Sequence, residues 1–260
     1  MKIIAIANQK GGVGKTTTSV NLAASLAQID KRVLLVDMDP QGNATMSSGV
    51  EKNAVEFSIL DLLLDEGDLE QCAIASPTGG FDVIPANGDL TAAEVELIDV
   101  DGKETRLKSG LAPGELRYDY VLIDCPPSLN MLTVNAMVAC HSILITMQCE
   151  YFALEGLSAL IDTINSVQQT VNADLKIEGI LRTLYDPRNA LTNEVSEQLY
   201  EHFDGLVYRT VIPRNIRLAE APSHGVPGIV YDRLSRGATA YMALAGEFMR
   251  RQEQDRKDPS

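Results

Sequence analysis

The sequence predicts an α/β fold with one doubly wound, mostly parallel sheet and helices on both faces. Two patterns in the 260 residues carry this prediction. Short, almost wholly apolar runs suit strands that are buried on both faces of a parallel sheet. They alternate with longer segments in which apolar residues recur every three or four positions, as in amphipathic helices. Strand–helix alternation of this kind implies right-handed crossovers.

The expected elements follow one another along most of the chain. The strands are predicted at Lys2–Ala7, Arg32–Val36, Tyr120–Ile123, Ser142–Thr146 and around Lys176–Leu181. The helices are predicted at Thr17–Gln28, Asn130–Ala139, Leu154–Gln169 and Asn193–Glu201. The polar, glycine-containing stretch Asp99–Arg117 is expected to be a surface excursion before the next strand.

The organisation along the chain indicates a single domain over residues 1–250. Residues 251–260 are mostly charged and lack apolar anchors, which predicts a loose tail. The apolar stretch at the N-terminus is too brief for the core of a signal peptide, so a cytoplasmic location is expected. The four cysteines show no metal-ligand spacing with the three histidines, which favours small buried side chains.

A glycine-rich turn between the first strand and the first helix is the strongest functional signal. It reads Lys10-Gly-Gly-Val-Gly-Lys-Thr16. In such a turn backbone N–H groups converge on phosphates, and the following helix presents its positive dipole end. Lys15 can reach the β- and γ-phosphates, and the Thr16 hydroxyl suits Mg²⁺. Gln9 stands where the usual spacing has glycine, and Lys10 is an additional lysine. The sequence thus predicts a P-loop ATPase that binds Mg-ATP.

Two aspartates follow predicted strands at the edge where parallel sheets bind ligands. Asp39 comes shortly after the second strand, and Asp124 directly follows Tyr120–Ile123. By itself either carboxylate could cap a helix or sit in a turn. Beside a phosphate loop, Asp39 is the candidate for orienting the attacking water and Asp124 for the surroundings of the metal. Lys10 can neutralise charge at its own phosphates or serve a facing subunit.

The charge balance limits the class of partners. A formal net charge of −14 argues against a surface that is basic throughout. Non-specific DNA binding would instead need a local row of cations. Arginines gather in the C-terminal third of the chain, where they are either solvated surface charges or DNA contacts: Arg182, Arg188, Arg209, Arg214, Arg217, Arg233 and Arg236.

The motifs together resemble the ParA/MinD ATPases with a deviant Walker A motif, and within them the ParA/Soj-type partitioning proteins. The resemblance is carried in order by KGGVGKTT at residues 10–17, VDMDPQGNAT at 36–45, IDCPPS at 123–128, QCEYFALEGL at 148–157 and VIPRNIRLAEAP at 211–222. Because the first strand starts at once, we expect this chain to lack the N-terminal DNA-binding extension of longer relatives. Thr146-Met147 and Arg182 depart from the usual residues, away from the phosphate chemistry.

The resemblance implies a set of roles for this chain. An ATP-bound homodimer would bind DNA without sequence preference, associate with the nucleoid, and be released when a ParB-type partner stimulates hydrolysis that is slow alone. Lys10 would reach the nucleotide of the partner subunit. The phosphate and Mg²⁺ contacts would come from Lys10, Gly11, Gly12, Val13, Gly14, Lys15, Thr16, Thr17 and Asp124. Asp39 would act in hydrolysis, Pro213 and Asn215 would border the adenine base, and Arg188 and Arg217 would contact DNA.

Three other functions are less well supported by the sequence. A membrane-positioning ATPase of the MinD type would need a basic amphipathic helix at the C-terminus, whereas Gly237–Met249 has the pattern of a helix packed on the core, so no membrane partner is expected. An electron donor like the nitrogenase iron protein would need suitably spaced thiolates, which Cys125 and Cys149 do not offer. A nucleotide-gated scaffold without turnover is disfavoured by Asp39 and Asp124.

Overall fold

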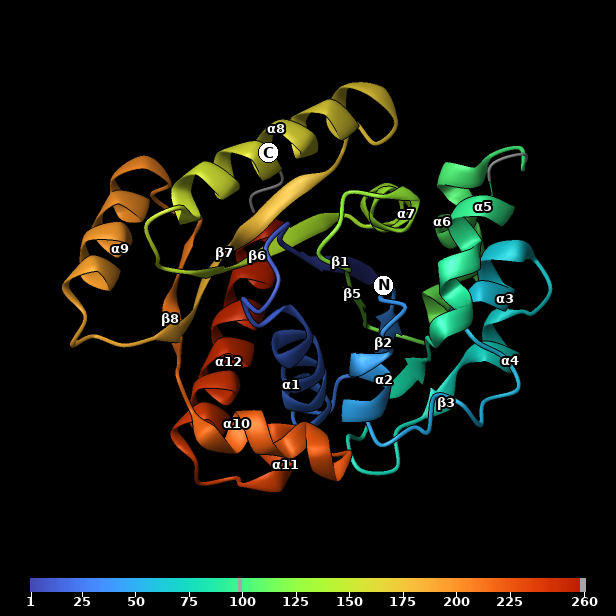
Figure 1. The fold of residues 1–260 in the computed structure, drawn as a ribbon, viewed down its shortest axis with the longest axis horizontal. Coiled ribbons are helices and arrows are strands. Elements are labelled where there is room, and N and C mark those ends of the chain that lie inside the picture. Colours follow the sequence, from blue (N-terminus) through green and yellow to red (C-terminus); the bar gives the residue numbers. More distant parts are fainter. Residues whose placement is uncertain (98–99, 258–260) are drawn as a thin grey trace.

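One eight-stranded sheet runs through the protein in a computed structural model that describes residues 1–97 and 100–257 (Figure 1). The strand order is β3-β4-β2-β5-β1-β6-β7-β8, and only the β3–β4 pair is antiparallel. The strands are β1 (Lys2–Ala7), β2 (Val33–Asp37), β3 (Ile74–Ala75), β4 (Asp82–Ile84), β5 (Tyr120–Asp124), β6 (Ser142–Gln148), β7 (Lys176–Tyr185) and β8 (Val207–Pro213).

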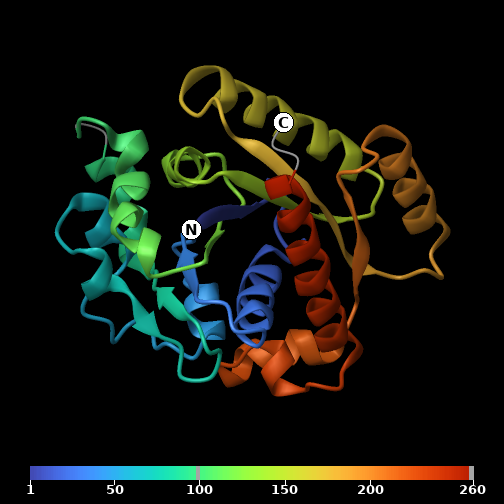
Figure 2. The ribbon, with the colours of Figure 1, turned by 180° about the vertical axis from the view of Figure 1, so that it is seen from behind.

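Helices cover both faces of this sheet, as Figures 1 and 2 show from opposite sides. The α-helices are α1 (Lys15–Ala27), α2 (Asn43–Ser47), α3 (Ile59–Leu64), α4 (Leu69–Cys72), α5 (Ala93–Glu96), α6 (Arg106–Leu111), α7 (Met131–Ala139), α8 (Ala153–Thr170), α9 (Ala190–His202), α10 (Ile216–Glu220), α11 (Gly228–Tyr231) and α12 (Arg236–Lys257). Short 3₁₀ turns are η1 (Gly88–Ala92), η2 (Lys103–Thr105), η3 (Ala112–Leu116) and η4 (Ala221–His224). The predicted doubly wound fold is confirmed.

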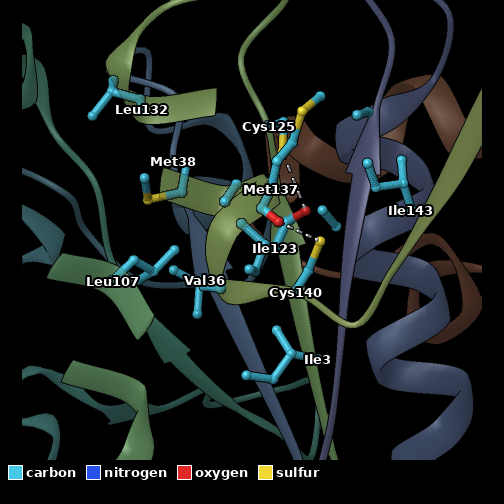
Figure 3. Packing of buried hydrophobic residues seen from close by; sticks show 14 of the residues in the cluster. Ile3, Val36, Met38, Leu107, Ile123, Cys125, Leu132, Met137, Cys140 and Ile143 are labelled. Carbon is cyan, nitrogen blue, oxygen red and sulfur yellow. Dashed lines mark hydrogen bonds between the residues drawn. The ribbon is translucent and has the colours of Figure 1, made fainter. Parts of the chain in front are cut away.

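The alternation of side chains along β1 divides the core in two. Ile4 and Ile6 belong to the hydrophobic cluster that α1 and α12 cover. Ile3, Ala5 and Ala7 belong to the cluster on the other face, which includes residues of α3, α6, α7 and α8 (Figure 3). A strand buried on both faces has to be apolar at consecutive positions, because neighbouring side chains point to opposite sides. This requirement explains the continuous apolar run from which β1 was predicted.

The segment before β5 differs from its prediction. Asp99 lies outside the described residues, but from Lys103 onward the chain forms η2, α6 and η3 instead of a surface excursion. Leu107 and Leu111 are buried in the hydrophobic core. The Leu107 amide also donates to the side chain of Asn135 on α7. The two leucines lie four residues apart on one face of a helix, and their burial explains why this segment is helical despite the glycines and polar residues around them.

The expected loose tail is also wrong for residues 251–257, because α12 continues to Lys257. Arg251 donates to the carbonyl oxygens of Gly205, Leu206 and Val207. Gln252 is buried, with its amide on Glu178 of β7. Polar contacts thus hold this last part of the helix against β7 and the start of β8. The hydrophobic pattern of the sequence does not reveal such contacts. Residues 258–260 lie outside the described part.

Candidate functional site

The glycine-rich turn lies at the carboxyl end of the strands, between β1 and α1. Strand β1 pairs with β5 on one side and with β6 on the other. The turn is therefore flanked by the ends of these strands, Asp124 and Gln148. Strand β2 follows β5 in the sheet and brings Asp37 opposite Asp124. The topology therefore brings the phosphate turn and the strand-end aspartates together at the carboxyl edge of the sheet.

The backbone of the turn is left-handed at two glycines. Gly14, which precedes the first residue of α1, has φ 81° and Gly12 has φ 73°. A side chain at either position would strain the backbone. Thr183 of β7 packs 3.6 Å from where a Cβ of Gly14 would stand, and its hydroxyl donates to the carbonyl of Val13 at 2.7 Å. A buried hydrogen bond from β7 therefore fixes the shape of the turn.

Lys15 is buried at the start of α1. Its Nζ donates to the carbonyl of Lys10 at 3.1 Å, across the turn. Burial lowers the pKa of Lys15, while Asp124, Cys125 and Asp39 act in the opposite direction. The ammonium group thus sits over a glycine-rich turn, close to carboxylates. Phosphate oxygens would supply the anions that such a partly desolvated cation favours.

Asp124 is fully buried and bonds to two hydroxyls of α1. Thr16 Oγ1 donates to one carboxylate oxygen at 2.7 Å and Ser19 Oγ to the other at 2.8 Å. Burial raises the pKa of Asp124 to about 6, and both hydroxyls oppose that shift. The Thr16 hydroxyl and an aspartate oxygen are hard ligands of the kind Mg²⁺ prefers. Ser19 was not singled out in the sequence, although its spacing of three from Thr16 places it on the same helix face.

Asp37 lies in the motif at residues 36–45 but is not among the residues predicted for the site. It is fully buried and accepts hydrogen bonds from the amide and hydroxyl of Thr45, both at 2.8 Å, and from the amide of Asp39. Burial, together with the charge of Asp124, raises the pKa of Asp37 to about 7. Asp39 itself is half-buried and its carboxylate accepts from the Gln41 amide. The Asp39 amide bonds to Asp37, which is opposite Asp124 in the sheet, and the Met38 amide donates to the Asp124 carbonyl at 3.0 Å, so Asp39 lies at this centre.

Lys10 points away from this buried group. Its exposed ammonium pairs with Glu150, just after β6, at 2.5 Å. The side chain of Asn8 holds the turn from the other side, accepting from the Lys10 amide and donating to the carbonyl of Thr146. Thr17 follows Thr16 on α1 and is half-buried. Hence the structure brings residues 10–17, Asp39 and Asp124 together.

The remaining candidates lie along the same edge, toward β8. Pro213 ends β8 opposite Tyr185 of β7, and Asn215 caps α10 by accepting from the Leu218 amide. Arg188 and Arg217 are exposed, and each is paired with carboxylates. Arg182, in contrast, is buried and donates to hydroxyls and carbonyls of α9 and β8, so it is not part of an exposed basic surface.

A cavity of about 1450 Å³ lies elsewhere, at the opposite end of the strands between β8 and the second half of α12. It is lined by Lys2, Ser142 and Lys176, the first residues of β1, β6 and β7. The phosphate turn lies at the other ends of these strands. The turn is the better candidate for the functional site because its glycines, Lys15 and Thr16 suit phosphate and Mg²⁺. The cavity is lined by charged side chains of both signs.

Known proteins are similar to this chain over almost its whole length. Residues 1–177 match a family model described as an AAA domain. The sporulation initiation inhibitor protein Soj of Bacillus subtilis is 55% identical over 95% of this chain and 97% of its own length. The chromosome partitioning protein ParA of Myxococcus xanthus is 49% identical over 96% of this chain and 88% of its own. The chain belongs to the ParA/Soj family of partitioning ATPases.

The fold of this ParA/Soj-type ATPase is also found in solved structures. A cobyrinic acid a,c-diamide synthase from Mycobacterium smegmatis, solved with an ATP analogue and magnesium, superposes with a TM-score of 0.85. It is 36% identical, and the match covers 97% of this chain and 96% of that one. The predicted P-loop fold is thereby confirmed together with the family.

Proposed function

We propose that this ParA/Soj-type ATPase binds Mg-ATP in the turn formed by residues 10–17. The observation that supports this most directly is the group of Lys15, Thr16 and Asp124, in which a buried lysine and a hydroxyl–carboxylate pair meet at the start of α1. Lys15 and the amides of Gly11, Gly12, Val13, Gly14 and Thr17 would hold phosphate oxygens. Thr16 would bind Mg²⁺, with Asp124 beside it.

ATP hydrolysis is the proposed reaction, slow in the protein alone. Mg²⁺, when bound, neutralises charge on the phosphates. Asp39 would orient the attacking water, because it is half-buried just after Asp37, which is opposite Asp124 at the end of the neighbouring strand. Lys10 would supply further positive charge, at the nucleotide of the partner subunit. Pro213 and Asn215 would border the adenine base from the end of β8.

We further propose an ATP-dependent switch for DNA segregation. The ATP-bound homodimer would hold DNA without sequence preference on the nucleoid in the cytoplasm, and a ParB-type partner would release it by stimulating hydrolysis. Exposed arginines near the ends of β7 and β8 and in the elements that follow support the DNA part. The Arg214 amide donates to the Tyr185 carbonyl at 3.4 Å, which places Arg214 at the end of β7, near Arg188. Arg217, Arg233 and Arg236 are also exposed, between α10 and the start of α12.

The experiment that tests this function compares the wild type with Lys15→Ala and Asp39→Ala. Nucleotide affinity, dimerisation and retention on random DNA are measured with ATP and Mg²⁺. We expect Lys15→Ala to lose nucleotide binding, and Asp39→Ala to bind ATP but remain as a DNA-bound dimer. Normal hydrolysis by Asp39→Ala would remove its proposed role. A wild type without affinity for millimolar Mg-ATP would refute the whole proposal.

The alternative of a membrane-positioning ATPase gains no support from α12. Tyr241, Leu244 and Phe248 of this helix are buried against the sheet and α1. Among residues 1–97 and 100–257, helices fall short of the length and apolar character needed to cross a bilayer. Co-sedimentation with anionic liposomes in the presence of ATP distinguishes the two functions. We expect the protein not to sediment with the liposomes.

A further inference from the structure

A buried asparagine of α1 joins this helix to α11. Asn21 is 3% exposed. Its side-chain amide donates to the carbonyl of Thr17 at 2.8 Å, one turn earlier in α1. Its side-chain oxygen accepts from the backbone amide of Ile229 in α11 at 3.0 Å. One side chain therefore connects the helix that carries Lys15 and Thr16 to a segment 208 residues further along the chain.

The first turn of α11 depends on this asparagine for a hydrogen-bond acceptor. Amides in the first turn of a helix have no acceptor within the helix, and a polar side chain at the N-cap usually supplies one. The N-cap of α11 is Pro227, which has no polar side chain. The bond between Ile229 and Asn21 is buried. Without Asn21 the Ile229 amide would be a buried donor that lacks an acceptor, which is costly.

Helix α11 in turn holds α10, which lies beside it and carries Arg217 (Figure 1). A Cβ on Gly228, the first residue of α11, would stand 2.5 Å from Cδ2 of Leu218 and 3.1 Å from the side-chain oxygen of Asn21. This glycine therefore lets α11 lie close against α10 and α1 at once. Asp232, the residue after α11, pairs with Arg217 at 3.3 Å. Both ends of α11 thus contact α10.

These contacts form one continuous connection from the nucleotide site to Arg217. It runs from Thr17 through Asn21 to Ile229 and then to Asp232. Helix α11 is a single turn, and the amide of Asp232 donates to the carbonyl of its first residue at 3.1 Å. A displacement of Ile229 is therefore passed on to Asp232, because coupling travels through packed and hydrogen-bonded neighbours.

We propose that Asn21 is a positioning residue, through which the nucleotide state of α1 sets the position of Arg217 for DNA. The inference rests on the proposed function and names a residue that links its two sites. If the nucleotide raises the affinity for DNA, DNA raises the affinity for the nucleotide by the same factor. A purely structural role of Asn21 in the packing of α11 would change the stability of the protein and leave this factor as it is.

The test compares the full-length wild type with Asn21→Leu, Asn21→Asp and Tyr241→Phe. Asn21→Leu removes the donor and the acceptor at a similar side-chain size, whereas Asn21→Asp keeps an oxygen for the Ile229 amide. Tyr241→Phe is the matched control, because it removes a buried 3.0 Å bond between the hydroxyls of Tyr241 on α12 and Thr18 on α1. The affinity for a non-hydrolysable ATP analogue with Mg²⁺ is measured without DNA. The affinity for random DNA is measured with and without the analogue.

We expect the analogue to raise the DNA affinity of the wild type, and Asn21→Leu to lose at least about fivefold of this gain. The affinity of Asn21→Leu for the analogue alone should stay within about threefold of the wild type, because Asn21 does not contact the phosphate turn itself. Asn21→Asp and Tyr241→Phe should keep the gain within about twofold.

An unchanged gain in Asn21→Leu overturns the inference, as does an equal loss of the gain in Tyr241→Phe or Asn21→Asp. Loss of analogue binding in Asn21→Leu would make Asn21 part of the nucleotide site and would also overturn it. A wild type that does not bind the analogue, or whose DNA affinity the analogue does not change, would instead refute the proposed function.

A double variant separates action through Arg217 from a general loss of packing. If Asn21 acts by positioning Arg217, then Arg217→Ala should weaken DNA binding by a smaller factor in the Asn21→Leu background than in the wild type, both with the analogue and Mg²⁺. Equal factors in the two backgrounds would show that the two residues act independently and would contradict the positioning role.

A measurement on the wild type alone does not depend on how well the variants fold. Amide hydrogen exchange of the peptide that contains Ile229 is followed with and without the analogue, at low protein concentration and without DNA. We expect exchange to slow when the analogue binds, because the Ile229 amide is bonded to the helix that the analogue holds in place. An unchanged exchange rate would contradict a connection from the nucleotide site to α11.

Discussion

Asp37 and Asp124 occupy paired positions at the ends of the neighbouring parallel strands β2 and β5. Both are fully buried, and burial raises the pKa of each carboxyl group, to about 7 and about 6. Lys15 is the cation whose charge favours ionisation of Asp124. Two carboxyl groups held together in this way repel each other when both are ionised. A divalent cation beside them would relieve that repulsion, which is a physical reason for Mg²⁺ at this edge of the sheet.

The first prediction concerns the pH dependence of stability without nucleotide or metal. Both aspartates have a folded-state pKa above the usual 3.8, so between about pH 4 and 7 the folded protein binds more protons than the unfolded chain. Their contribution to the free energy of unfolding therefore falls as pH rises through this window. Urea unfolding of Asp37→Asn should show a smaller fall than the wild type. Glu66 is exposed, so Glu66→Gln should keep the wild-type slope of unfolding free energy against pH. The same slope in Asp37→Asn would contradict a raised pKa of Asp37 in the folded protein.

The second prediction tests the bond between β7 and the phosphate turn. Thr183→Val keeps the shape of the side chain but leaves the carbonyl of Val13 without its 2.7 Å hydrogen bond. Loss of a buried partner costs about 1–3 kcal/mol. We expect a lower free energy of unfolding and a roughly five- to tenfold weaker affinity for Mg-ATP. Thr170→Val on the exposed end of α8 is the control and should change neither, because its hydroxyl bonds only within its own helix.

The third prediction concerns the end of α12. Arg251→Ala removes donors to three carbonyls around the start of β8 and a guanidinium that stacks 3.9 Å from the Tyr208 ring centroid. The free energy of unfolding should fall by about 1–3 kcal/mol. The exposed neighbour Arg250→Ala should stay within about 0.5 kcal/mol of the wild type. Equal values for the two variants would mean that residues beyond 250 behave as the loose tail that composition suggests.

The sequence predicted the five central strands and the phosphate turn because these depend on local patterns. Apolar runs such as Lys2–Ala7 and Tyr120–Ile123 mark strands buried on both faces, and β1 has the predicted bounds. Strands β3, β4 and β8 lie toward the two edges of the sheet and were not predicted, since their runs are short or mixed with polar residues. The roles of Arg251 and Gln252 depend on partners distant in sequence, which periodicity does not encode.

The candidate site was also predicted from local patterns. The residues missing from that prediction are those whose role depends on contacts between distant parts of the sequence. Residues 10–17 and Asp124 are each recognisable within a short segment, and the parallel sheet brings them together. The sequence predicts Asp39 and not Asp37, and only the strand register shows that Asp37 is opposite Asp124. The sequence does not predict a role for Glu150 either, because its ion pair with Lys10 joins residues 140 positions apart.

The last prediction tests the DNA surface through the carboxylates that hold Arg217. This arginine pairs with Glu220 at 2.9 Å and with Asp232 at 3.3 Å, so its charge is partly neutralised in the free protein. With the ATP analogue and Mg²⁺, Arg217→Ala should weaken binding to random DNA by a similar factor for every sequence. The slope of log affinity against log salt should lose about one unit, as expected for one phosphate contact. ATP hydrolysis without DNA should persist.

Glu220→Gln is the matched opposite, because it keeps the size of the side chain and removes the charge that competes with phosphate for Arg217. Affinity for DNA should rise, most clearly at low salt where charge interactions are least screened. Glu197→Gln on α9 removes one exposed negative charge away from the Arg217 pair, so it controls for net charge alone. Equal gains in Glu220→Gln and Glu197→Gln would show that only the net charge matters, and unchanged DNA retention in Arg217→Ala would remove this arginine from the surface.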